Sequence, residues 1–254
     1  MKTGITLLTM GQGNVLALKK TLESFKGVCD EVVYGDLLIF ESDREVVKSY
    51  QKEYNTRVVE LPFNYIFKNG FSACLNTLAS LATNDIVMYM NTSETIQTDN
   101  GILEIIKNNP DCNMFYFDHE TDKHRWFRCY NRKEMYWSGV IHEEVIGDAR
   151  PYHKPIFRMA DMEKDLDDPF KAKVFDDVKE IVYFNQYLKL VDEPDKSGAT
   201  NQGWVDFARD NYESMKYRLE KKGERYRAFI EDDFELFMND INTNPEFENE
   251  KTKL

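Results

Sequence analysis

Short apolar runs alternate with segments of helical spacing along the N-terminal part of the chain. Residues 4–10 form an apolar run rich in β-forming residues, and the run breaks at Gly11-Gln12-Gly13-Asn14. The apolar positions that follow recur at the spacing of a helix: Val15, Leu16, Leu18, Leu22 and Phe25. This pattern predicts a strand, a loop and a helix.

The same unit repeats further along. Residues 31–35, 56–61 and 85–90 are predicted strands, and residues 44–54 and 71–82 are the predicted helices between them. Such alternation indicates an α/β fold with a Rossmann-like, mainly parallel, doubly wound sheet and helices on both faces. Ligands of these sheets bind beyond the carboxyl ends of the strands, which is where candidate residues are sought.

The pattern changes in the second half. After a predicted helix at residues 101–108, residues 113–117 and 125–130 are predicted antiparallel strands. Residues 204–241 are dense in charge, with aromatic residues at helical intervals, and predict one or two surface helices. The expected organisation is a core over residues 1–148, a mostly helical extension over residues 149–241, and a polar, disordered tail over residues 242–254.

Composition narrows the class of protein. The chain has 254 residues, 42% of them hydrophobic, which suffices for one substantial core. Its 33 Lys and Arg against 45 Asp and Glu give a formal charge of −12, which disfavours nucleic acid as a partner unless a local basic groove overrides it. Four widely spaced cysteines predict reduced thiols: Cys29, Cys74, Cys112 and Cys129.

The N-terminal apolar run is too short for a signal peptide, and no segment reaches the roughly 18 apolar residues of a membrane span. We therefore expect a cytoplasmic protein without a membrane span.

Several polar residues follow the predicted strands. Asp36 could accept the N–H of a base or bond a ribose hydroxyl, although a solvated turn aspartate fits the sequence equally well. In Asn91-Thr92-Ser93-Glu94 the only carboxylate is Glu94, which could hold a hard cation through oxygen or cap a helix. Lys68, Asn69 and Asn76 could contact phosphate or sugar, with capping and turn roles as the alternative.

Two later groups carry further candidates. One of Arg125, Arg128 and Arg132 could act as a phosphate clamp, whereas others of the three would lie on an exposed strand face. The triplet His142-Glu143-Glu144 could join metal binding to general-base work, or could be structural.

The order of these elements resembles that of the family 2 glycosyltransferases of the GT-A fold, over residues 5–144. In that family the second strand ends in an aspartate, as at Asp36, and a Ser-x-Asp-like stretch follows, which Glu41-Ser42-Asp43 resembles. A helix with an asparagine then precedes a strand and an acidic D-x-D-E motif. Phe71-Ser-Ala-Cys-Leu-Asn76 and Met88-Tyr-Met-Asn-Thr-Ser-Glu94 are similar to these two segments.

The most specific likeness is a later block. Arg125-Trp-Phe-Arg128 and Trp137-Ser-Gly-Val-Ile-His-Glu143 are similar to a family subset with an R-x-F-R strand and a W-x-G-x-x-H-E ending. This likeness implies Arg128 near the donor phosphates, His142 near the metal or diphosphate, and Glu143 as the base at the acceptor hydroxyl.

The resemblance implies a transferase that moves a sugar from a nucleotide-sugar donor, with a UDP-sugar favoured, to a hydroxyl acceptor with inversion. The implied donor contacts are Thr9, Gly11, Asp36, Asp43, Lys68, Asn76, Asn91 and Arg128. The implied ligands of a divalent cation, Mn²⁺ or Mg²⁺, are Ser93, Glu94 and His142, and the implied catalytic base is Glu143.

The largest departure from the family pattern lies in the acidic motif, where Asn91 and Ser93 replace both aspartates. Three alternatives remain open. The site binds the cation weakly through Asn91, Ser93 or Glu94 and the diphosphate, it uses arginines instead, or it has lost activity.

Two other classes compete with the transferase. Gly11-x-Gly13 followed by Asp36 fits the start of a dinucleotide-binding fingerprint for an NAD-dependent oxidoreductase, but Leu16 stands at the third glycine position. The missing aspartates also fit a non-catalytic binding module of the same fold. The acceptor stays open between a glycan, a peptide, a small molecule and a modified DNA base, and the helical extension is expected on the acceptor side.

Overall fold

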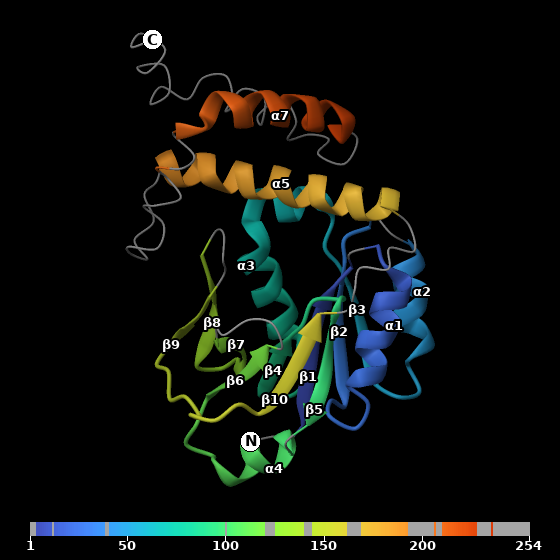
Figure 1. The fold of residues 1–254 in the computed structure, drawn as a ribbon, viewed down its shortest axis with the longest axis vertical. Helices are drawn as coiled ribbons and strands as arrows, with labels where there is room; N and C mark the ends of the chain where they lie inside the picture. The colour runs from blue at the N-terminus through green and yellow to red at the C-terminus, as the bar shows by residue number, and fades with distance from the viewer. Residues whose placement is uncertain are drawn as a thin grey trace.

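An eight-stranded sheet organises the molecule, in the order β3-β2-β1-β4-β7-β6-β10-β5 (Figure 1). The computed structural model describes residues 4–11, 13–38, 41–99, 101–119, 125–139, 144–161, 169–192, 206, 210–227 and 235. The strands of this sheet are β1 (Ile5–Met10), β2 (Glu31–Asp36), β3 (Asn55–Glu60), β4 (Ile86–Tyr89), β5 (Glu94–Asp99), β6 (Met114–His119), β7 (Arg125–Asn131) and β10 (Phe157–Asp161).

The sheet is parallel in its first half and mixed in its second. β1 pairs in parallel with both β2 and β4, and β2 pairs in parallel with β3. β7 is antiparallel to β4 and β6, whereas β10 is parallel to β6 and antiparallel to β5. The prediction of an α/β fold with a mostly parallel sheet is confirmed, and the antiparallel pairing of the two predicted later strands is also confirmed.

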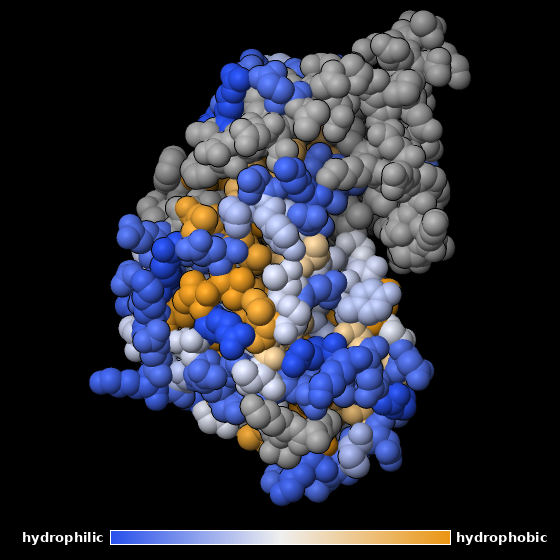
Figure 2. Space-filling view, turned by 180° about the vertical axis from the view of Figure 1, so that it is seen from behind, coloured by the Kyte–Doolittle hydropathy of each residue, from blue (hydrophilic) through white to orange (hydrophobic). Residues whose placement is uncertain are grey.

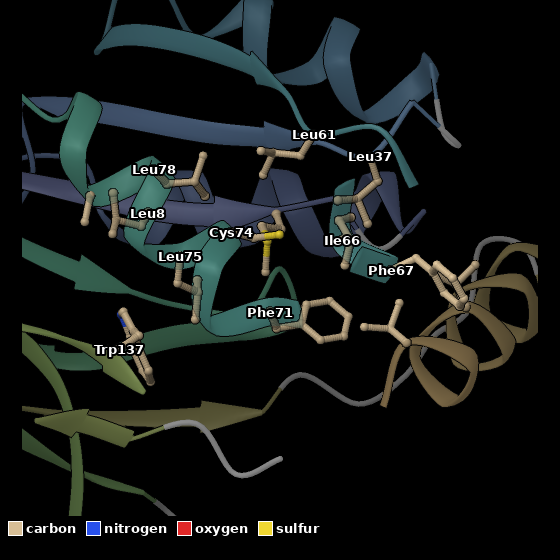
Figure 3. Packing of buried hydrophobic residues seen from close by; sticks show 14 of the residues in the cluster. Leu8, Leu37, Leu61, Ile66, Phe67, Phe71, Cys74, Leu75, Leu78 and Trp137 are labelled. Carbon is tan, nitrogen blue, oxygen red and sulfur yellow. The ribbon is translucent and has the colours of Figure 1, made fainter. Parts of the chain in front are cut away.

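Helices cover both faces of the sheet. Their bounds are α1 (Val15–Ser24), α2 (Glu41–Ser49), α3 (Phe63–Leu81), α4 (Ile102–Asn108), α5 (Pro169–Asp192) and α7 (Tyr212–Arg225). Side chains alternate along β1, so that Leu7 packs with the α1 and α2 side while Leu8 packs with α3. Figure 3 shows the α3 side, where Leu8 lies near Leu75 and Leu78.

The sheet extends past the expected core boundary at Asp148. β10 lies between β6 and β5, where Met159 is fully buried and Arg158 pairs in register with Asp118. A separate two-stranded sheet joins β8 (Met135–Ser138) to β9 (Glu144–Gly147). Sequence periodicity missed β10 and β5, because β10 lies between two strands distant in sequence and β5 is a short strand at the edge of the sheet, so tertiary pairing specifies both.

Helix α3 is longer than predicted and is kinked. Its first residue is Phe63, so Lys68 and Asn69 lie within the helix and not in a loop before it. The kink is at Gly70, with φ 76° and ψ 174°, a conformation that is essentially restricted to glycine. Because the kink interrupts the helical ladder, backbone groups beside it need other partners, and the Phe67 carbonyl accepts hydrogen bonds from Asn185 and Gln186 of α5.

The C-terminal helices form a layer held to this kinked helix. α5 lies across the end of α3, and α7 lies on the outer side of α5 (Figure 1). The nearly buried Asp177 of α5 accepts from Tyr226 at 3.1 Å and pairs with Lys222 at 3.0 Å and Arg225 at 3.3 Å. The fully buried Leu219 completes the contact, so both apolar packing and charge join the two helices.

The described surface is mainly hydrophilic. One apolar area lies near the middle of the face in Figure 2, bordered by hydrophilic side chains. Among the described residues the exposed large apolar side chains are Leu16, Leu38, Leu103, Tyr136 and Tyr217.

None of the described helices has the length and apolar character to cross a bilayer. The four cysteines are free thiols, as predicted.

Replacing Gly70 by Ala is expected to lower the free energy of unfolding by about 1–3 kcal/mol, because the residue must leave a glycine-only conformation. A Cβ there would also lie 3.2 Å from the Gln186 side chain. Gly101→Ala is the control, since Gly101 has φ 79° but no atom within 4 Å of an added Cβ. Equal losses in urea denaturation of the two variants would contradict a specific fit between the kink and α5.

The α5–α7 contact is expected to weaken at alkaline pH. Burial opposes the charge of Lys222, but hydrogen bonds to Glu180 and Asp177 outweigh burial and raise its pKa above the ordinary 10.5. Burial and Asp177 also raise the pKa of Tyr226 above 10.0. A group whose pKa is raised by folding stabilises the folded protein fully at pH values below the group's pKa in the unfolded chain. This stabilisation is lost as the pH rises through the group's pKa in the folded protein.

Thermal unfolding between pH 9 and about pH 12 measures this effect, since those values bracket the titration of lysine and tyrosine. Lys222→Met should flatten the alkaline decline, whereas Lys221→Met, at an exposed neighbouring position, should leave the decline unchanged. An identical decline in wild type and Lys222→Met would show that the decline arises elsewhere.

Candidate functional site

The candidate site lies where the parallel strands β1, β2 and β4 end. Register places Thr9 beside Tyr34 and Leu8 beside Tyr89, so the segments that follow the three strands emerge together. Two backbone hydrogen bonds extend this alignment, from Gly11 N to Gly35 O and from Met90 N to Leu8 O, each at 3.1 Å. Sequence segments far apart along the chain therefore meet at one edge of the sheet.

The glycine loop after β1 packs closely over β2 and α2. Gly13 N donates to Asp43 Oδ2 at 2.9 Å, and Asp43 is fully buried. A Cβ at Gly11 would lie 2.2 Å from the hydroxyl oxygen of Tyr34, so the loop requires glycine at this position. Burial, reinforced by the Asp43 carboxylate, raises the pKa of Tyr34 far above its usual value, and the hydroxyl stays protonated. Asp43 thus holds the loop from beneath.

Asp36 is buried at the end of β2, with 1% of its surface exposed. One carboxylate oxygen accepts from Leu38 N at 2.9 Å, and the other pairs with the guanidinium of Arg44. Leu38 has a left-handed φ of 60°, which is rare outside glycine, and its side chain is 44% exposed. Asp36 therefore fixes the backbone after β2 and the direction of Arg44.

The most highly connected group is Glu94, the first residue of β5. Its side chain is 6% exposed and forms an ion pair with Arg128, whose Nη1 lies 2.9 Å from both carboxylate oxygens. Asn91 adds two bonds, from its backbone N to Oε2 at 2.7 Å and from Nδ2 to Oε1 at 2.9 Å. From α1, the Thr21 hydroxyl lies 2.9 Å from the carbonyl oxygens of Thr92 and Glu94. The loop after β4 is thereby held from two sides.

Aromatic side chains form one wall beside this ion pair. The guanidinium carbon of Arg128 lies 5.6 Å from the ring centroid of Tyr89, within the range of a cation–π contact. The Tyr89 hydroxyl donates to Asn91 Oδ1 at 2.8 Å, and its ring packs edge-on against Trp137 at 5.6 Å. Tyr89 therefore links the loop after β4 to the separate β8–β9 sheet.

Helix α3 holds the segment that contains the W-x-G motif. Asn76 donates from Nδ2 to Trp137 O and accepts at Oδ1 from Trp137 N, both at 2.8 Å. Ser72 Oγ donates to Gly139 O at 2.6 Å. The side-chain amide of Asn76 thus bonds the backbone of β8, and α3 fixes the chain as far as Gly139.

The predicted site residues fall into three groups. The structure brings Asn91, Glu94 and Arg128 into direct contact, and it connects Asn76 to them through Trp137 and Tyr89. Others occupy their own surroundings: Gly11, Asp36 and Asp43 in the loops after β1 and β2, Thr9 buried at the end of β1, Ser93 half-buried and Lys68 exposed on α3. His142 and Glu143 lie outside the described residues.

Sequence reasoning missed several supporting residues. Thr21, Tyr34 and Tyr89 were absent from the candidates because each reads as an ordinary position in a helix or strand pattern. Tyr89 had one signal, since it stands at the end of a buried strand two residues before Asn91.

The side-chain oxygens of Glu94 and Asn91 already accept hydrogen bonds from protein groups, which leaves little capacity for a divalent cation at these two residues. A carboxylate offers about four lone-pair sites, and Glu94 accepts the four hydrogen bonds described above. Asn91 Oδ1 accepts from Tyr89. A dication coordinated by Glu94 would also lie beside the guanidinium of Arg128, whose positive charge opposes its own. Within the described ranges, no group of three or more His, Cys, Asp and Glu side chains could hold a metal ion.

No family model matches the chain, and no curated protein sequence matches it. Among solved structures, residues 1–349 of S. aureus TarS cover 99% of this chain and 92% of their own length at 10% identity and a TM-score of 0.45. The mannosyltransferase PcManGT from Pyrobaculum calidifontis, solved with GDP-Man and Mn²⁺, covers 88% of this chain and 74% of its own at 12% identity and a TM-score of 0.45.

A third structure, the bifunctional IspDF from Campylobacter jejuni, covers 51% of this chain and 41% of its own at 14% identity and a TM-score of 0.33. The same TarS fragment has also been solved with UDP-GlcNAc. At these TM-scores and identities, the function of this chain has to be argued from its own residues.

Asn76→Leu is expected to free the β8 backbone while keeping the side-chain volume, since the variant removes both hydrogen bonds to Trp137. A lost pair of partly buried bonds of this kind costs about 1–3 kcal/mol. Hydrogen exchange of a peptide covering residues 135–139 should accelerate at least tenfold, an order-of-magnitude expectation. Asn69→Leu, on the exposed side of α3, is the control. Unchanged exchange in Asn76→Leu would show that Asn76 does not hold β8.

Proposed function

We propose that the chain is a glycosyltransferase that moves a sugar from a nucleotide-sugar donor, a UDP-sugar in the first instance, to a hydroxyl acceptor with inversion. The observation that carries the proposal is the meeting of separate motifs at one edge of the sheet. The segment Asn91-Thr92-Ser93-Glu94 contacts Arg128 of the R-x-F-R strand directly. Asn76 of the preceding helix holds Trp137 of the W-x-G block. These segments are the ones whose sequences resemble family 2 glycosyltransferases.

The chemistry of transfer sets three tasks for such a site. The acceptor oxygen attacks the anomeric carbon, the bond from that carbon to the diphosphate oxygen breaks, and the nucleoside diphosphate leaves with the electron pair. The acceptor proton passes to a base, which we assign to Glu143. The departing diphosphate gains negative charge, and we assign its stabilisation to Arg128. Tyr89 and Asn91 would border the donor beside it.

The buried carboxylates suggest indirect roles in donor binding. Asp36 and Asp43 are each almost wholly buried and bonded to protein groups, so they would shape the loops that receive the donor. The proposed direct contacts with the base and sugar then come from backbone groups of these loops and from Arg44, whose side chain is 29% exposed.

The dinucleotide-binding alternative has less support from the same residues. The need for glycine at position 11 is explained by the Tyr34 hydroxyl, and Leu16 at the third fingerprint position is 45% exposed. The aspartate that would bind a ribose in that class, Asp36, is paired with Arg44. A non-catalytic binding module remains the second candidate, because both aspartates of the acidic motif are replaced.

Calorimetry against UDP-, GDP-, CMP- and dTDP-sugars and NAD tests the class of ligand. We expect binding of one class of sugar nucleotide together with slow release of its sugar, since water can replace the acceptor. Binding of NAD alone would contradict the transferase, and binding of a sugar nucleotide without any turnover would favour the non-catalytic module.

Glu143→Gln is expected to lower the rate of sugar transfer by roughly 10²–10⁴-fold while leaving donor affinity unchanged, because the variant removes the proposed base and keeps its shape. The matched control is Glu144→Gln, at the adjacent exposed carboxylate that begins β9. If both variants transfer sugar at the wild-type rate, Glu143 is not the base.

A further inference from the structure

We propose that the guanidinium of Arg128, fixed by Glu94, takes the place of a divalent cation at the donor diphosphate, so that this chain binds its donor without metal. The proposal rests on the function proposed above and concerns the same site. It is drawn from the hydrogen bonds, burial and charge of Glu94, Asn91 and Arg128.

The carboxylate of Glu94 is fully engaged by protein donors. Oε1 of Glu94 accepts from Asn91 Nδ2 and Arg128 Nη1, and Oε2 accepts from Asn91 N and Arg128 Nη1. These four bonds match the four lone-pair sites of a carboxylate. A cation could coordinate Glu94 only by displacing the arginine or one of the two donors of Asn91, which hold the loop after β4.

The acidic motif of this chain lacks both of its aspartates. Where a D-x-D-E motif would offer further carboxylates, this chain has Asn91 and Ser93. Asn91 directs its amide N–H groups toward Glu94, and its Oδ1 accepts from the Tyr89 hydroxyl. Hard cations favour several oxygen ligands, and a protein site for Mg²⁺ usually supplies one or two carboxylates beside waters and substrate phosphates. Compared with a D-x-D-E motif, this segment therefore has one carboxylate, that of Glu94. Donors of Asn91 and the guanidinium of Arg128 surround it.

Arg128 places a positive charge at the carboxyl end of β4. Cys129 pairs with Met88 in an antiparallel register, so Arg128, the residue before Cys129, lies beside Tyr89 at the carboxyl end of β4. Its side chain is 12% exposed and packs against the Tyr89 ring. A guanidinium presents a planar fork of donors that suits phosphate oxygens, and it keeps its charge at every physiological pH. A fixed guanidinium at this edge supplies charge with little rearrangement when a diphosphate arrives.

The test measures binding of UDP, GDP and dTDP to the full chain by calorimetry, first in excess EDTA and then with Mn²⁺. We expect the nucleoside diphosphate that binds to have the same Kd within twofold under both conditions. We also expect electron paramagnetic resonance to detect no bound Mn²⁺ in the absence of nucleotide. A tenfold or greater gain in affinity with Mn²⁺ would overturn the inference while leaving the glycosyltransferase in place.

Failure of the function itself gives a different result. If no nucleoside diphosphate or sugar nucleotide binds in either condition, the proposed function is wrong and this inference falls with it. The two failures are therefore distinguishable in one set of titrations.

A pair of variants tests the role of Arg128. Arg128→Gln should weaken binding of the nucleoside diphosphate in EDTA at least tenfold, but leave binding of the corresponding nucleoside within twofold, because only phosphate contacts are lost. Arg132→Gln is the matched control, since Arg132 directly follows β7 and donates to Asn84 O. Equal loss for nucleoside and diphosphate would indicate a merely structural arginine and would contradict the proposal.

Because Arg128→Gln leaves the Glu94 carboxylate buried, the double variant Glu94→Gln/Arg128→Gln provides a second measurement with the buried charge removed. It should show the same selective loss of diphosphate affinity as the single variant. Wild-type diphosphate affinity in a folded double variant would overturn the assignment.

Discussion

The ion pair between Glu94 and Arg128 ties the connection from β4 to β5 to the neighbouring strand β7. The chain leaves β4 and, after a short loop, starts β5, although three strands separate these two in the sheet order. Glu94 begins β5 and binds Arg128 on β7, the immediate neighbour of β4. Thr21 of α1 holds the same loop from the other side. The path of the chain from β4 to β5 and the position of the candidate site both depend on these contacts.

Buried carboxylates serve as anchors throughout the site. Asp43 binds the glycine loop, Asp36 binds the backbone after β2 together with Arg44, and Glu94 binds the loop after β4 together with Arg128. Burying a charge is costly unless it is paired and hydrogen-bonded. Asp36 and Glu94 each have an arginine partner, and Asp43 accepts from the backbone of Gly13. The negative charges of these three carboxylates are thus directed at protein groups and not at a ligand. The arginines that these carboxylates orient are the groups suited to meet an anionic ligand.

The sequence was sufficient for the parallel strands and for the neighbourhood of the site, because period-2 and helical patterns are local and the carboxyl ends of parallel strands meet at one edge. It was insufficient for the kink at Gly70, where the helical pattern only begins to read clearly at Phe71. It was also insufficient for the pairing of Glu94 with Arg128, which are 34 residues apart and meet through strand register. Burial of Asp36 and its bond to Arg44 likewise arise from tertiary packing.

A nucleotide-sugar donor that is held at this edge by a fixed arginine would change the surroundings of that arginine's side-chain nitrogens. Nitrogen NMR of arginine side chains reports on it directly, with UDP-sugar added to the labelled protein in EDTA and the Arg128 resonance assigned by its absence in Arg128→Gln. We predict that the chemical shift of the Arg128 signal changes as donor is added and stops changing once the donor site is saturated. The Arg132 signal should keep its position. A donor that binds without moving the Arg128 signal would contradict the account.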